Sequence, residues 1–110
     1  MDISTRASGN ATVVSVGGRV DATTAPELAN TLTQAVNEGK IKLIVSLEKL
    51  EYVSSAGLRA FLATAKMINA KNGKLVLAGL QGSVRQVFEI SGLLPVFNVV
   101  DSEAEALKLF

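Results

Sequence analysis

Two adjacent hydroxyls, those of Ser54 and Ser55, are the groups of this chain best placed to do chemistry. The apolar run 43–47 before them is short enough for a strand, and apolar residues recur at helical spacing from Leu58 onward. The serines therefore lie at a predicted helix N-terminus, where free backbone N–H groups and the helix dipole favour an acceptor oxygen. A phosphate would be favoured there still more strongly, so this junction is a candidate site for a switch.

The absence of histidine and cysteine is the strongest negative observation in the composition. It removes the commonest general base, the Ser-His-Asp and Cys-His nucleophile systems, and metal sites built from thiolate or imidazole ligands. An enzyme would have to use carboxylates, lysines or hydroxyls, and no pair of acidic residues forms a recognisable acid and base arrangement. We therefore expect neither an enzyme nor a bound cofactor or metal ion.

The length and composition predict one domain, residues 1–110, which can bury a core without disulfides or metals. Apolar residues make up 48% of the chain and charged residues 19%, as in ordinary globular domains. A net charge of +1 and an aromatic content of 5% do not give the surface of a nucleic-acid binder. No apolar run approaches the ~18 residues of a membrane span, and no signal pattern is present. We expect a cytoplasmic protein.

Hydrophobic periodicity and turn residues predict strands that alternate with helices. An N-terminal hairpin precedes a mixed, mainly parallel sheet of four to five strands with about four helices, which defines an α/β fold class. The predicted strands are 3–6, 11–20, 42–47, 74–78 and 96–100, and the predicted helices are 24–39, 54–69, 82–91 and 102–110.

Local signals define the ends of these elements and the position of three loops. Gly17 and Gly18 predict a bulge or a close backbone approach in the second strand. Loops 21–24, 54–55 and 81–83 follow strands, so we expect them at one edge of the sheet. Capping boxes are predicted for Thr24 with Glu27, Ser83 with Gln86, and Ser102 with Glu105.

The segment Ser54-Ser55-Ala56-Gly57-Leu58 resembles the phosphorylation site of the anti-sigma factor antagonists, Asp-Ser-Ser/Thr-Gly-Leu, in the STAS domain family. The resemblance extends over nearly the whole chain and implies a STAS-type single domain. Three further segments resemble family signatures in the same order: Gly18-Arg19-Val20-Asp21, Ser91-Gly92-Leu93-Leu94 and the final helix from Ser102 to Leu107.

This resemblance implies an anti-sigma factor antagonist that works by partner switching. The unphosphorylated form would bind an anti-sigma factor that is also a serine kinase, and thereby release the sigma factor. Phosphorylation of Ser55, with Ser54 as the alternative acceptor, would block this binding until a serine phosphatase restores it. Ser54 stands where the family usually has an aspartate. The predicted partner-binding residues are Asp21, Thr23, Ser54, Ser55, Ala56, Gly57 and Arg59.

Several residues also have structural interpretations. The hydroxyl of Ser55 could simply satisfy backbone donors at a helix start, which stabilises a helix by about 1 kcal/mol. Asp21 could form a turn of the Asx type, and Arg59 could belong to a solvated helix face. The alternative function is that of a STAS scaffold subunit, never phosphorylated, in a lipid-transport or stressosome-like complex. An enzyme that uses carboxylates on this type of sheet is a more remote alternative.

Overall fold

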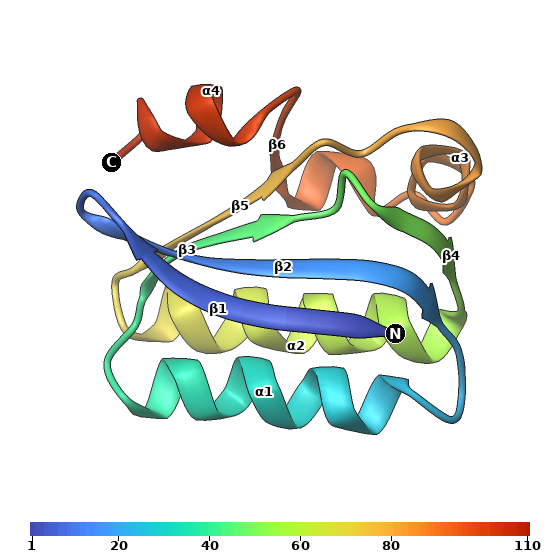
Figure 1. Ribbon diagram of the computed structural model, residues 1–110, viewed down its shortest axis with the longest axis horizontal. Helices are drawn as coiled ribbons and strands as arrows, with labels where there is room; N and C mark the ends of the chain where they lie inside the picture. The colour runs from blue at the N-terminus through green and yellow to red at the C-terminus, as the bar shows by residue number, and fades with distance from the viewer.

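Six strands and four α-helices follow one another along the computed structural model, which describes residues 1–110 (Figure 1). None of the helices is long and apolar enough to cross a membrane. The elements are β1 (Asp2–Ser8), β2 (Ala11–Val20), α1 (Ala25–Asn37), β3 (Lys42–Ser46), β4 (Leu50–Val53), α2 (Ser55–Ala70), β5 (Lys74–Ala78), α3 (Gly82–Ile90), a 3-10 turn (Leu94–Val96), β6 (Asn98–Val100) and α4 (Glu103–Leu107).

The sheet has the strand order β1-β2-β3-β5-β6, and β4 pairs with β2 outside this path. The β1–β2 pair is an antiparallel hairpin, whereas all other pairs are parallel. This arrangement confirms the predicted mixed, mainly parallel sheet with an N-terminal hairpin. The count of six strands exceeds the predicted four to five because β4 was missed. That strand has four residues, and exposed Glu51 and Tyr52 interrupt its apolar pattern.

Strand β2 is long enough to pair with two parallel partners in succession. Its first half pairs with β3 through residues 12–15, and its last residues pair with β4. The register shifts next to Gly18, whose φ of +79° is a conformation that glycine adopts without steric cost. The Gly18 N–H donates to the carbonyl oxygen of Lys49 at 2.9 Å. The predicted irregularity at Gly17 and Gly18 is therefore confirmed.

Helices cover both faces of the sheet. Figure 1 shows α1 and α2 side by side on one face and α4 on the other. The larger hydrophobic cluster lies on the α1 and α2 side, where Phe88 of α3 packs against Phe61 of α2 and against Phe97. A smaller cluster on the other face joins Ala106 of α4 to residues of β2, β3 and β5. The sheet is thus buried most deeply where helices cover both sides.

One of the three predicted capping boxes has its expected N-cap bond. The Ser102 hydroxyl accepts from the backbone N–H of Glu105 at 3.2 Å. The box at Thr24 is wrong because its hydroxyl is engaged with loop backbone instead of capping α1. The box at Ser83 is wrong because α3 already begins at Gly82, so that Ser83 lies inside the first turn.

The C-terminal elements are shorter than predicted. The last strand begins at Asn98 rather than Val96, because Pro95 lies in a 3-10 turn that precedes it. A proline has no N–H for a sheet ladder, which favours such a turn. The final helix ends at Leu107 rather than at Phe110.

Gly57 fits the start of α2 against the ends of β2 and β4. A Cβ atom at this position would lie 2.7 Å from Val20 Cγ1 and 2.8 Å from Val53 Cγ2. Both valines are buried and cannot move freely. The backbone of Gly57 is not in the left-handed region, so the need for glycine here comes from close packing.

We expect Gly57→Ala to lower the free energy of unfolding by about 1–2 kcal/mol, because overpacking outweighs the better helix propensity of alanine. Urea denaturation followed by circular dichroism measures this change. In a Val20→Ala background, which makes room for the new methyl group, the added cost of Gly57→Ala should fall. An equal cost in both backgrounds would contradict the packing explanation.

Candidate functional site

Two of the three loops predicted to share an edge are neighbours. Val20 pairs with Val53 in the parallel β2–β4 ladder, and the Ser54 N–H donates to the Val20 carbonyl oxygen at 2.8 Å. The loop at Asp21 and the loop at Ser54 therefore leave the sheet together. Figure 1 shows that α1 and α2 both start at the side of the molecule where β2 and β4 end.

The third loop, 81–83, has hydrogen bonds to a different segment. The side-chain amide of Gln81 donates to the Glu48 carbonyl oxygen at 2.7 Å. The Ser83 hydroxyl donates to the backbone carbonyl oxygen of Glu51 at 3.5 Å. These contacts involve the start of β4 and the residue Glu48 before it, rather than Ser54, which follows the end of β4. All three loops therefore follow the carboxyl ends of parallel strands, as predicted, and the β2–β4 pairing makes neighbours of the loops at Asp21 and Ser54.

Ser54 is the N-cap of α2. Its backbone is extended, with φ −88° and ψ 172°, and its hydroxyl oxygen accepts from the backbone N–H of Gly57 at 3.3 Å. The residue is half-buried. Its hydroxyl therefore already has a structural role, which is to satisfy one of the free donors of the helix start.

Ser55 is the first residue of α2 and has a different environment. The residue is exposed, and its hydroxyl forms no hydrogen bond with the protein. Ala56 is half-buried and Gly57 is buried, so neither offers a polar side chain to a partner. Of the two serines, Ser55 is the one whose oxygen is free to react or to contact another molecule.

Asp21 organises the neighbouring loop. Its Oδ1 accepts from the backbone N–H of Thr23 at 3.0 Å and from that of Thr24 at 3.1 Å. The Thr24 N–H is the main cause that holds the pKa of Asp21 below its ordinary value, and the nearby Arg19 guanidinium also lowers it. The Asx-type turn predicted for Asp21 is therefore present, and it directly follows Val20, whose carbonyl oxygen accepts from the Ser54 N–H.

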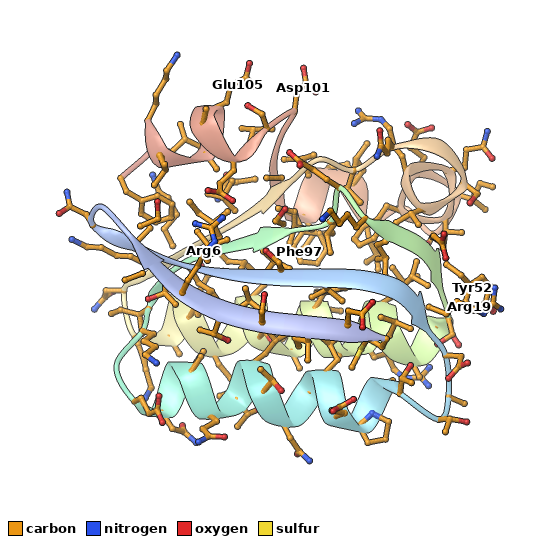
Figure 2. All side chains as sticks on the ribbon, viewed as in Figure 1. Arg6, Arg19, Tyr52, Phe97, Asp101 and Glu105 are labelled. Carbon is orange, nitrogen blue, oxygen red and sulfur yellow. The ribbon has the colours of Figure 1, made fainter.

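An exposed pair that the sequence did not single out lies at the same end of the sheet. The guanidinium carbon of Arg19 lies 4.3 Å from the ring centroid of Tyr52, and Figure 2 shows both side chains at the edge of the molecule. Tyr52 is 39% exposed, which is unusual for a large aromatic residue here. The pair forms because Arg19 and Tyr52 are partners in the β2–β4 ladder. The pairing of Arg19 with Tyr52 could not be predicted from the sequence, because strand β4 was not predicted.

The remaining predicted residues, Thr23 and Arg59, are exposed. Arg59 lies in the second turn of α2 and forms no ion pair. The site is therefore a surface with two arginines, one engaged carboxylate and a free serine hydroxyl. No group of three or more acidic residues could hold a metal ion.

A hollow in the surface of the molecule lies away from these residues. It has a volume of about 890 Å³ over β1, β2 and the segment 48–51, and none of the predicted site residues lines it. A binding site for a small molecule is usually concave and largely apolar. The surface around Ser55 is better suited to contact with another protein.

We expect Asp21→Asn to be less stable than the parent protein at about pH 7, since it keeps an acceptor oxygen but loses the charge. A carboxylate with a lowered folded-state pKa stabilises the fold above its ordinary pKa, and this effect is lost as the pH falls through the folded-state value. Urea unfolding at about pH 7 and about pH 3 should show the difference between the proteins shrinking in acid. A difference that does not change with pH would contradict the role of the charge.

Comparisons with known proteins agree with this geometry. The model of the STAS domain matches residues 2–106. The chain is 41% identical over 93 residues to BtrV of Bordetella bronchiseptica, which carries the provisional description of anti-sigma factor antagonist; the match covers 84% of this chain and 80% of BtrV. It is 36% identical over 86 residues to the anti-sigma-B factor antagonist of Staphylococcus aureus, with 78% and 80% covered.

The fold is also similar to a solved structure of the Bacillus cell fate determinant SpoIIAA in its phosphorylated form. The TM-score is 0.75 at 22% identity, and the match covers 97% of each chain. At this identity the likeness supports the fold alone. Together with the family model and the two closer sequence relatives, it shows that the chain belongs to the STAS domain family and groups with its anti-sigma factor antagonists.

Proposed function

We propose that this protein is an anti-sigma factor antagonist controlled by phosphorylation of Ser55. The unmodified form binds an anti-sigma factor that is also a serine kinase, and the sigma factor is released. Phosphorylation ends this binding, and a serine phosphatase restores it. The observation that carries the proposal is the contrast between the two serines: Ser54 caps α2, whereas Ser55 is exposed with a free hydroxyl.

The position of Ser55 is suited to a charge switch that leaves the fold intact. A phosphate adds about −1.5 to −2 charges and three acceptor oxygens. The start of a helix tolerates this charge because its free N–H groups and dipole favour an anion. The effect is therefore local, and partner contacts across the loops of Asp21 and Ser55 are lost through bulk, desolvation and repulsion.

The serine at position 54 fits this proposal even though the family usually has an aspartate there. Aspartate and serine are both good N-cap residues, and the Ser54 hydroxyl makes the capping bond to Gly57. What the substitution removes is a negative charge next to the acceptor. The surface that the kinase meets is correspondingly richer in positive charge, with Arg19 and Arg59 exposed near the switch.

The proposed site consists of Asp21, Thr23, the loop 54–57 and Arg59, and the protein itself has no catalytic role. The two sequence relatives described above are anti-sigma factor antagonists by name, and this supports a regulatory rather than a catalytic role. We propose that it works in the cytoplasm without direct contact to nucleic acid. Neither a cofactor nor a metal ion takes part in this mechanism.

The proposal is tested by incubating the protein with its cognate kinase and ATP. Intact mass should show one added phosphate, and peptide mapping should place it on Ser55. Ser55→Ala should accept none, while the matched control Ser54→Ala should still be modified. Phosphate that maps to another residue would refute the assignment. Tight kinase binding without phosphate transfer would do the same and would favour the scaffold alternative.

A further inference from the structure

Arg59 is exposed on α2, and this helix has no acidic side chain that could form an ion pair with it. The positions three and four residues from Arg59 are Ser55, Ala56, Leu62 and Ala63. By contrast, Arg85 on α3 is paired with Glu89 four residues later, at 3.1 Å. Arg59 forms no such pair in this structure.

Ser55 and Arg59 are four residues apart on the same helix, so they lie on one face, one turn apart. Both residues are exposed. A negative group on the N-terminal side and a cation four residues later is the favourable orientation for such a pair. Ser54 precedes the helix with an extended backbone, and its hydroxyl is engaged with the Gly57 N–H, so it does not stand one helical turn from Arg59.

We propose that the guanidinium group of Arg59 binds the phosphate on Ser55 and holds it against α2. This inference rests on the proposed function, because it describes how the modified site is arranged. An arginine fork matches the geometry of phosphate oxygens and forms charge-assisted hydrogen bonds with them. The unmodified chain lacks any anion on α2 for Arg59, so the pair forms only after phosphorylation.

The pairing has a consequence for the switch. Before modification, Arg59 projects from the predicted partner surface as an unpaired cation. After modification, the same side chain is engaged by the phosphate four residues away. Phosphorylation thus adds negative charge and also withdraws a positive group that a partner could contact.

The test uses protein in which phosphoserine is installed at position 55 during translation, so that no kinase is needed. Phosphorus NMR then follows the second ionisation of the phosphate against pH. With Arg59 present, the acid dissociation constant should be about twofold larger than in Arg59→Gln, because a nearby cation favours the dianion. Equal constants in the two proteins would overturn the proposal.

Two controls separate this pairing from general charge effects. Lys66→Gln removes an exposed cation of the same helix about three turns from Ser55, and it should titrate like the parent. With phosphoserine at position 54, Arg59→Gln should have no effect. A shift as large in either control would also overturn the proposal. If the kinase failed to modify Ser55, the proposed function would fail while this titration still reported on Arg59.

Discussion

The parallel pairing between the ends of β2 and β4 is the interaction on which the candidate site depends. The Ser54 N–H bond to the Val20 carbonyl oxygen joins two segments more than thirty residues apart in the chain. It brings the turn organised by Asp21 next to the start of α2. It also places Arg19 against Tyr52. Gly57 then allows α2 to approach both strands closely.

This arrangement divides two tasks between adjacent serines. Ser54 uses its hydroxyl inside the protein to cap α2, and Ser55 keeps its hydroxyl outside. A rigid junction beneath an exposed reactive group suits a switch that changes charge without changing the fold. The hollow over β1 and β2 is not lined by Ser54 or Ser55, so it does not belong to this junction.

The sequence predicted the elements whose signals are local. Strands β2 and β5 have the predicted bounds, because alternating or continuous apolar residues define them. Strand β4 was missed because two of its four residues point to solvent, and its pairing depends on the distant Gly18. The capping box at Thr24 failed for a related reason. There the backbone of the loop competes for the hydroxyl, and only the folded loop shows this competition.

The central claim is that a phosphate on Ser55 ends partner binding while the domain stays folded. Calorimetric titration of the cognate anti-sigma kinase with unmodified protein, and with protein carrying phosphoserine installed at position 55, tests it most directly. We expect the modified protein to bind at least about 100-fold more weakly, at an unchanged circular dichroism spectrum. Equal affinity of the two folded forms would contradict the account.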